Sequence, residues 1–292
     1  MCPAPDRAGL RGNGEHSCGG SITQTEGGTR MNKVKVGIIG GTHGMGRWFA
    51  GLLKKEGFIV NVCGRKTKLQ INDLARLCNV IVVAVPISTT AAIIRQVGPQ
   101  LTKDKLLMDL TSLKNEPVKL MLVHSEAEVI GCHPLFGPQL KGVTRQNVIL
   151  CPARGKKWLG WLKGVLKNNK LAVWEATPEK HDKMMAIVQA LNHLNTITMG
   201  VALAQTNITL AEINRFSTPI FRTKLDIIRK VFTESPEMYV DIITGNPQTI
   251  KMLDIYEKVL KDIRAKIKSG GRAKSKEVLD KAAKQLYGSQ NK

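Results

Sequence analysis

Short apolar runs alternate with helical patterns from position 34 onward. The segment 34–39 is an apolar run that ends at glycines, and 80–85 is a buried-type run closed by Pro86. Between them, 47–56 repeats apolar residues at helical spacing and is followed by Gly57, a typical C-cap. Strands and helices that alternate in this way predict a parallel sheet with helices on both faces. Further strands are expected over 58–63, 105–110, 128–132 and 148–151, and a helix over 89–97.

The pattern changes after position 174. Thr177-Pro178-Glu179 combines an N-cap residue, a proline at the first helical position and an acid in the first turn. Apolar residues then recur at helical spacing and no strand pattern returns, so 177–269 is predicted to be all-helical. Ser269-Gly270-Gly271 is a breaker before a basic segment that we expect to form a surface helix. The apolar positions are Met184, Ile187, Val188, Leu191, Leu194 and Ile197.

The first thirty residues differ from the rest of the chain. They are rich in Gly, Ser and Thr, show no periodicity and contain no apolar segment of the kind found in secretory signals. Asp6, Glu15 and Glu26 are unusual for an organelle transit peptide. We expect 1–30 to be a disordered extension, with Met31 at the start of the first domain or of the native chain. The predicted organisation is then an α/β domain over 31–176, a helical domain over 177–269 and a basic tail over 270–292.

Composition and charge narrow the class of protein. The 292 residues are 42% hydrophobic and 23% charged, which is typical of a globular protein and not of a disordered one. The 44 Lys and Arg against 23 Asp and Glu give a net charge of +21, which favours an anionic partner. Aromatic residues are only 4%, so nucleic acid binding is disfavoured and a small anionic substrate is expected. No apolar run approaches the length of a membrane-spanning helix.

The cysteines are scattered and form no C-x-x-C pair. This arrangement argues against a zinc site and against a disulfide scaffold, so no metal is predicted. Free cysteines fit a reducing compartment, and we expect a cytoplasmic protein. The six are Cys2, Cys18, Cys63, Cys78, Cys132 and Cys151.

A glycine-rich turn separates the first predicted strand from the first predicted helix. A dinucleotide-binding turn belongs at this place, because a pyrophosphate needs close approach of the backbone and the N-terminus of a helix. Compared with G-x-G-x-x-G, His43 replaces the middle glycine, and a tight turn without a ligand is the alternative. Val85 and Pro86, at the end of a later strand, are assigned to the same cofactor. The residues of the turn are Gly40, Gly41, Thr42, His43, Gly44, Met45 and Gly46.

The end of the second strand distinguishes between the two nicotinamide cofactors. An NAD-binding turn usually places Asp or Glu there, to bind the ribose 2′-hydroxyl. This chain has Arg65, Lys66 and Thr67 instead, two cations and a hydroxyl that suit a 2′-phosphate. We therefore favour NADP, with NAD possible, and the alternative is that Arg65 and Lys66 are ordinary loop charges.

Two further segments follow predicted strands. Asp109-Leu110-Thr111-Ser112-Leu113-Lys114 comes after one strand and Gly131-Cys132-His133-Pro134 is at the end of another. Open α/β sheets bind their ligands at the carboxyl ends of such strands. A histidine there, near a serine hydroxyl, is a candidate general base. The alternative for His133 is a hydrogen-bonded structural role.

Together these segments resemble the prephenate dehydrogenase family, whose members oxidatively decarboxylate prephenate or arogenate on the way to tyrosine. The resemblance runs from about 31 to about 266. It is carried by the glycine-rich turn and by Asp109-Leu110-Thr111-Ser112-Leu113-Lys114, His133-Pro134-Leu135-Phe136-Gly137-Pro138, Glu179-Lys180-His181-Asp182, Leu191-Asn192-His193, Ser217-Thr218-Pro219-Ile220-Phe221-Arg222 and the segment 235–242.

The resemblance implies roles for individual residues. His133 corresponds to the histidine that takes the proton of the substrate's ring hydroxyl, and Ser112 to a serine that hydrogen-bonds near it. His181 and His193 correspond to histidines that line the site. On a regular helix their twelve-residue spacing would set them roughly 120° apart.

The substrate's carboxylates are expected to meet cations of the helical domain. Arg222 corresponds to an arginine of that domain in the family. A second carboxylate-binding arginine is expected eight residues later, where this chain has Lys230 beside Arg229. Lysine binds a carboxylate as a point charge and lacks the bidentate geometry of arginine, so the choice between prephenate and arogenate stays open.

The implied fold is a Rossmann-type sheet domain followed by an all-helical dimerisation and substrate domain, and the implied assembly is a homodimer. The implied reaction converts prephenate to 4-hydroxyphenylpyruvate with hydride transfer to NADP. The alternatives are an arogenate dehydrogenase, a deazaflavin-linked NADP reductase, and a non-catalytic protein that binds NADP or a polyanion.

Overall fold

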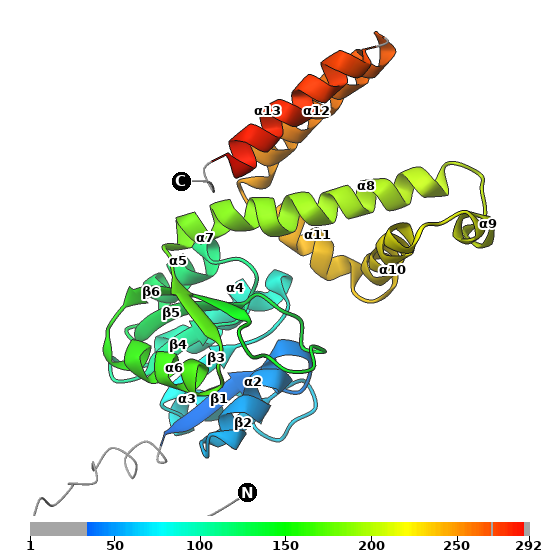
Figure 1. Cartoon of the computed structure of the whole chain (residues 1–292). Coiled ribbons are helices and arrows are strands. Elements are labelled where there is room, and N and C mark those ends of the chain that lie inside the picture. The colour runs from blue at the N-terminus through cyan, green and yellow to red at the C-terminus, as the bar shows by residue number, and fades with distance from the viewer. Residues whose placement is uncertain (1–33, 270, 289–292) are drawn as a thin grey trace, which may run out of the picture.

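A seven-stranded sheet forms the first part of the molecule (Figure 1). The computed structural model describes residues 34–269 and 271–288, so the extension expected over 1–30 and the start at Met31 lie outside the described residues. The strand order is β2-β1-β3-β4-β5-β6-β7, and all neighbours are parallel except β5 and β6, which are antiparallel. The strands are β1 (Lys35–Ile39), β2 (Ile59–Cys63), β3 (Val80–Val83), β4 (Leu106–Asp109), β5 (Glu128–Pro134), β6 (Asn147–Arg154) and β7 (Ala172–Glu175).

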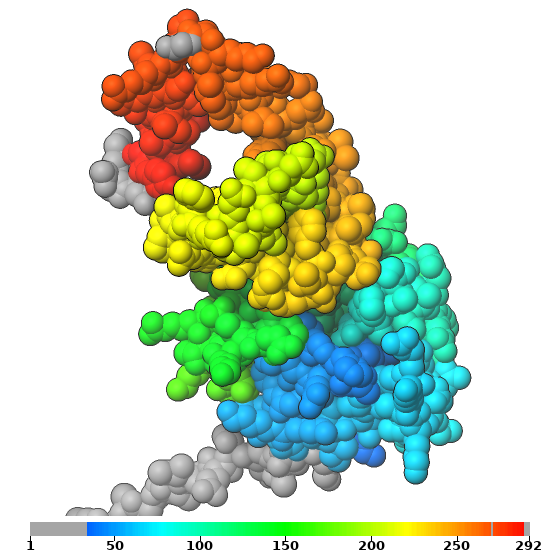
Figure 2. All heavy atoms as spheres, turned by 90° about the vertical axis from the view of Figure 1, so that its right-hand side faces the viewer, coloured from blue at the N-terminus to red at the C-terminus, as the bar shows by residue number. Residues whose placement is uncertain are grey.

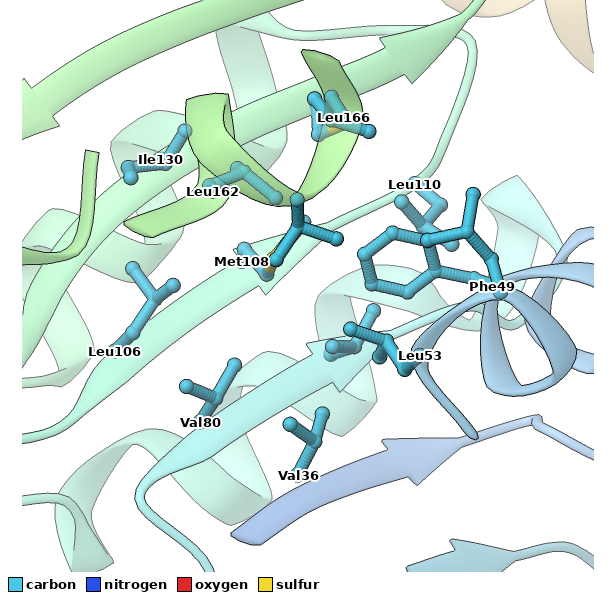
Figure 3. Packing of buried hydrophobic residues seen from close by; sticks show 14 of the residues in the cluster. Val36, Phe49, Leu53, Val80, Leu106, Met108, Leu110, Ile130, Leu162 and Leu166 are labelled. Atoms are coloured by element: carbon cyan, nitrogen blue, oxygen red, sulfur yellow. The ribbon is translucent and has the colours of Figure 1, made fainter. Parts of the chain in front are cut away.

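Helices bury both faces of this sheet. Successive residues of β3 point to opposite faces, so that Val80 and Val82 enter one apolar cluster while Ile81 and Val83 enter the other. The first cluster is closed by helices α2 and α6, as Figure 3 shows for Phe49, and the second by α3, α4 and α5. The helices are α2 (Gly44–Lys55), α3 (Ile71–Leu77), α4 (Ile87–Val97), the short η1 (Gly98–Gln100), α5 (Asn115–His124) and α6 (Lys157–Asn168).

The Rossmann-type fold expected from the sequence is confirmed, with two strands, β6 and β7, running opposite to the other five. The predicted strands are all present within a few residues of their expected ends, whereas α3, α5, α6 and β7 were not predicted. The expected parallel sheet is formed by β1 to β5, whereas β6 and β7 run antiparallel to those five strands. A parallel connection needs a crossover of a dozen or more residues, usually a helix, but 135–146 contains no helix and β6 returns beside β5.

The second part of the molecule is helical. Its first helix begins as the sequence predicts, because the Thr177 hydroxyl accepts a hydrogen bond from the backbone N–H of Lys180 at 3.2 Å. Helix α7 then continues without a break through a π-helical segment, η2, into α8 (Figure 1). The elements are α7 (Pro178–Met185), η2 (Ala186–Leu191), α8 (Asn192–Ala204), α9 (Leu210–Arg215), α10 (Pro219–Thr233), α11 (Pro236–Gly245), α12 (Thr249–Lys268) and α13 (Arg272–Tyr287).

Helices α12 and α13 form a hairpin that projects from the rest of the molecule (Figure 2, orange and red). Helix α13 contains no buried residue, as expected for the surface helix predicted in the basic tail. Among the described residues, no helix is both long and apolar enough to cross a membrane. The basic hairpin is thus attached to the body mainly through α12.

Candidate active site

The glycine-rich turn connects β1 to α2 in a conformation that only glycine supports at two places. Gly40 has a φ of +85°, and a Cβ atom there would lie 2.4 Å from the carbonyl oxygen of Ala84. A Cβ atom on Gly46 would lie 2.4 Å from the carbonyl oxygen of Gly40. The start of α2 is therefore pressed against the end of β1, as the close helix–strand packing of a dinucleotide-binding turn requires.

The N-terminus of α2 is open to an anion. Its N-cap residue, His43, makes no capping hydrogen bond, and the first turn contains no acidic residue. The side chains of Thr42 and His43 instead pair with each other, Oγ1 to Nδ1, at 2.9 Å. The space that a side chain would take at Gly44 is empty. Unsatisfied N–H groups at a helix N-terminus attract phosphate, so this turn fits the pyrophosphate of a dinucleotide.

The loop after β2 lies beside this turn. The backbone N–H of Gly40 donates to the carbonyl of Cys63 at 2.8 Å. A Cβ atom on Gly64 would come within 3.0 Å of the Thr42 side chain. Arg65 and Lys66 follow directly and are both exposed. The two cations expected at a 2′-phosphate are therefore next to the glycine turn.

The sequence pattern suggested that the Thr67 hydroxyl binds a 2′-phosphate, but in the structure this hydroxyl makes hydrogen bonds within its own loop. Its Oγ1 accepts the backbone N–H of Gly64 at 2.9 Å and lies 2.9 Å from the carbonyl oxygens of Gly64 and Leu69. The hydroxyl thus closes the loop on itself. Arg65 and Lys66, in contrast, are exposed to solvent.

Val85 also reaches the turn, and Pro86 follows it at the start of α4. The Val85 side chain would be 3.0 Å from a Cβ atom on Gly40. Pro86 is the N-cap residue of α4, and its carbonyl accepts the backbone N–H of Thr90 at 3.1 Å. Met45 is half-buried and packs against the apolar cluster under α2. The residues assigned to a cofactor from the sequence are therefore neighbours in space.

His133 lies at the end of β5, on the same edge of the sheet as the glycine turn. The two are linked by the loop after β5, where the Phe136 ring packs edge-on against Trp48 of α2 at 5.0 Å between centroids. His133 is only 3% exposed. Its Nδ1 lies 2.9 Å from Nε2 of His181, and its Nε2 lies 3.4 Å from Nε2 of Gln189. The imidazole is thus held by two side chains, one from α7 and one from η2.

His181 is in turn held by its neighbour in sequence. Its Nδ1 is 2.7 Å from Oδ1 of Asp182. The Asp182 carboxylate also accepts the backbone N–H groups of Lys114 and Asn115, each at 2.9 Å. Asp182, His181 and His133 therefore form one chain of hydrogen bonds. Sequence reasoning placed His181 at the site but assigned no role to Asp182 or Gln189.

A buried ion pair lies close to His133. Lys114 is fully buried and its Nζ contacts Oδ2 of Asp109. Thr111 donates to the same oxygen from its backbone N–H at 3.0 Å and from its hydroxyl at 2.5 Å. The motif containing these residues was recognised from the sequence, but nothing in the pattern separated Lys114 from an ordinary surface lysine. The site is thus bordered by a buried, hydrogen-bonded pair of side chains.

The surroundings of His133 keep its imidazole neutral. Burial lowers the pKa of His133 well below its usual 6.5, and the electrostatic effects of the neighbouring Lys114 and His181 lower the pKa further. A histidine that is neutral at pH 7 can accept a proton. His133 is therefore a candidate general base.

Ser112 and His193, which the resemblance assigns to the site, lie outside the chain of hydrogen bonds that the structure describes at His133. Ser112 is half-buried, and within residues 34–269 and 271–288 it makes no hydrogen bond to His133. The His193 ring packs against the Tyr239 ring of α11, with 4.8 Å between centroids, and burial lowers the pKa of His193. The offset of roughly 120° assumed a regular helix from His181 to His193. That assumption is wrong, because η2 has the wider turns of a π-helix.

The three cations expected at the substrate carboxylates lie on α10. Arg222, Arg229 and Lys230 are all exposed, and α10 packs on α8 and α11. In the part of the chain that the structure describes, none of the three forms an ion pair. Among the described residues, no ion pair or hydrogen bond joins these cations to His133.

Comparison with known proteins adds two family models that match the chain in succession. The one described as prephenate dehydrogenase, nucleotide-binding domain, matches residues 49–175. The one described as prephenate dehydrogenase, dimerization domain, matches residues 177–281. The first match begins after the glycine-rich turn, so the turn is supported by its own geometry.

Curated relatives bear related names. A probable arogenate/prephenate dehydrogenase of Methanocaldococcus jannaschii is 35% identical over 282 residues, covering 90% of this chain and 63% of the relative. A T-protein of Enterobacter agglomerans is 32% identical over 226 residues, covering 76% of this chain and 59% of the relative. The chain thus spans about three fifths of the length of these relatives.

Solved structures share the fold. Prephenate dehydrogenase from Aquifex aeolicus, in complex with hydroxyphenyl propionate and NAD+, superposes with a TM-score of 0.71 at 22% identity, covering 86% of this chain and 96% of that one. Arogenate dehydrogenase from Synechocystis gives a TM-score of 0.66 at 19% identity, covering 88% and 99%. These likenesses show a common architecture of sheet and helical parts.

Proposed function

Because the chain belongs to the prephenate dehydrogenase family, we propose that it converts prephenate to 4-hydroxyphenylpyruvate and CO2 with NADP as the oxidant. The observation that carries this proposal is the buried, neutral His133 at the edge of the sheet that also holds the glycine turn. A proton acceptor and a dinucleotide cradle at one edge are what an alcohol oxidation needs. The product is a precursor of tyrosine.

The protein's part in this reaction is to orient the substrate and to take its proton. His133 Nε2 accepts the proton of the ring hydroxyl while hydrogen leaves the same carbon as hydride. The bound nicotinamide supplies the hydride acceptor. Loss of the ring carboxylate as CO2 then leaves an aromatic ring, which makes the reaction effectively irreversible. Proton transfer to a positioned base typically contributes about 10²–10⁴ in rate.

We assign the cofactor to the glycine turn and the loop after β2. The open N-terminus of α2 would hold the pyrophosphate, and Arg65 and Lys66 would hold the 2′-phosphate of NADP. The loop from Gly64 to Thr67 contains no acidic residue for a free 2′-hydroxyl. The charge of this loop therefore favours NADP over NAD.

The substrate's carboxylates require cations. We propose Arg222, Arg229 and Lys230 for this purpose, with Ser112 and His193 lining the pocket. The side chains of the three cations are exposed, so they are accessible to an anion. The net charge of +21 adds a long-range attraction for a dianionic substrate.

We further propose that two copies of the chain associate through their helical parts. Helices α9 to α12 expose large apolar side chains, among them Phe216 at 85% and Ile220 at 76%. Exposed apolar surface of this extent marks an interaction site. The family model matching this region is described as a dimerization domain. Light scattering after gel filtration should give the mass of a dimer, and a monomer at micromolar concentration would contradict the proposal.

A two-by-two assay tests the reaction. The purified protein is mixed with prephenate or arogenate and with NADP or NAD, and reduced nicotinamide is followed by absorbance. Activity with prephenate and NADP is the expected result. Activity with arogenate alone would reassign the substrate while leaving His133 as the base. Four inactive mixtures, with a folded protein that still binds NADP, would reject the proposal in favour of a non-catalytic NADP-binding protein.

A further inference from the structure

We propose that Asp182 and His181 are positioning residues that fix the tautomer of His133, so that its Nε2 carries the lone pair and its Nδ1 the proton. This inference deepens the proposed function and rests on it, since His133 is the base of that reaction. It also changes the role of His181, from a residue that contacts the substrate to one that acts through His133.

The argument starts at Asp182. Its Oδ1 accepts the backbone N–H of Lys114 and its Oδ2 accepts that of Asn115, both at 2.9 Å. Hydrogen bonds from two amides stabilise the ionised carboxylate, which can only accept. Nδ1 of His181, 2.7 Å from Oδ1, must therefore be the donor.

The proton on Nδ1 of His181 determines the rest of the chain. In a neutral imidazole the other nitrogen is then an acceptor, so Nε2 of His181 presents its lone pair to His133. Nδ1 of His133, 2.9 Å away, must donate to it. A neutral His133 with its proton on Nδ1 has an unprotonated Nε2, which is the atom that the proposed reaction needs as the base.

The orientation of the Gln189 side chain agrees with the same assignment. Its side-chain nitrogen lies 3.4 Å from Nε2 of His133. An amide nitrogen is only a donor, so the atom it approaches is an acceptor. Gln189 comes from η2, and its own oxygen is buried without a hydrogen-bond partner among the described residues.

Groups from three other elements also surround His133. Lys114 and Asp109 form their ion pair on one side, and Cys132 and Cys151 are buried nearby on β5 and β6. Burial raises the pKa of Cys132 above its usual range and that of Cys151 to about 12, so both thiols stay neutral at neutral pH. The carboxylate and the histidine of α7 are thus the groups that can set the tautomer.

The test reads the tautomer directly by NMR on protein labelled with ¹⁵N-histidine. The two-bond couplings of ring protons to nitrogen distinguish a protonated Nδ1 from a protonated Nε2. In the wild-type protein at neutral pH we expect His133 and His181 both to carry the proton on Nδ1. A His133 protonated on Nε2 would overturn the inference, whether or not the protein oxidises prephenate. The wild-type spectrum therefore separates failure of this inference from failure of the proposed function.

Two substitutions of His181 complete the test. His181→Leu removes the acceptor, so we expect the Nδ1 tautomer of His133 to be lost and kcat to fall about 10–100-fold, with KM for NADP unchanged. His181→Gln can offer an amide oxygen to Nδ1 and should restore both the tautomer and most of kcat. His124→Gln, on α5, is the matched control for the loss of a histidine outside this chain of hydrogen bonds.

Unchanged NMR signals and kcat in His181→Leu would contradict the positioning role. Equal loss of kcat in the Leu and Gln variants would contradict it as well, because the rescue depends only on the acceptor atom. If His181→Leu fails to fold, the wild-type spectrum and the Gln variant still decide the question.

Discussion

Nδ1 of His133 lies 2.9 Å from Nε2 of His181, although the two residues are 48 positions apart and belong to different parts of the fold. His133 ends a strand of the sheet, and His181 is in the first helix of the helical part. The proposed base therefore comes from the sheet, and its hydrogen-bond partner comes from the helical part. This contact connects the function of the sheet edge to the packing of the helices.

The first prediction concerns the base itself. His133→Asn should fold normally, because asparagine is smaller than histidine and retains a hydrogen-bonding group towards His181. It should lower kcat by about 10²-fold or more, since asparagine cannot accept the proton. Steady-state kinetics and circular dichroism measure the two effects. A kcat within a few-fold of the wild type would mean that His133 is not the base.

The second prediction concerns pH. The pKa of folded His133 lies well below 6.5, whereas the unfolded chain should bind this proton near pH 6.5. Between these two pKa values the unfolded state holds more protons, so the free energy of unfolding decreases as pH falls below about 6.5. The acid limb of kcat/KM, which reports protonation of the free enzyme's base, should also lie below pH 6.5.

Denaturant titrations at several pH values measure this dependence. In His133→Asn the loss of stability in acid should be smaller than in the wild-type protein, because one of the groups that cause it is gone. An identical dependence in the two proteins would assign it to other groups.

The third prediction concerns cofactor choice. Replacing both Arg65 and Lys66 with alanine should raise KM for NADP about 10-fold or more and leave KM for NAD nearly unchanged, because a charge-assisted hydrogen bond contributes about 1.5–3 kcal/mol. Lys68→Ala is the matched control, since Lys68 is also exposed and lies two positions further on. Equal effects of the two changes would indicate only a general electrostatic attraction.

The fourth prediction compares two glycines of α2. Gly46→Ala places a methyl group 2.4 Å from the Gly40 carbonyl oxygen, so we expect a loss of stability of about 1–3 kcal/mol and weaker NADP binding. Gly51 has open space around its Cβ position, and Gly51→Ala should stabilise the helix by up to about 1 kcal/mol. Thermal unfolding and NADP titration separate the two outcomes. Equal tolerance of both changes would show that the turn can relax.

Local patterns in the sequence predict much of this molecule. The buried strands appear as apolar runs, and the start of α7 is specified by Thr177 and Pro178. The glycines between β1 and α2 are spaced as in a dinucleotide-binding turn, apart from His43. Each of these depends on residues that are close together in the chain. Their positions at one edge of the sheet then follow from the rule that parallel strands end there.

The remaining features depend on contacts between distant segments. The reversed β6 is determined by its pairing with β5, which its own residues do not reveal. The π-helical segment rotates every later residue about the helix axis relative to a regular α-helix. Regular helical spacing therefore could not predict the direction in which His193 points. Lys114 and Asp182 are charged residues that a sequence pattern assigns to the surface. Only their partners, Asp109 and the amides of α5, explain their burial.

The carboxylate of Asp182 couples two features of the structure, because its hydrogen bonds serve both at once. The same group secures the first helix of the helical part to the N-terminus of α5 and orients His181. If α7 moved away from α5, the hydrogen bonds from Asp182 to the backbone of Lys114 and Asn115 would break. The same movement would change the orientation of His181 and, through it, of His133. The position of His133 therefore depends on the contact between α7 and α5 as well as on the sheet.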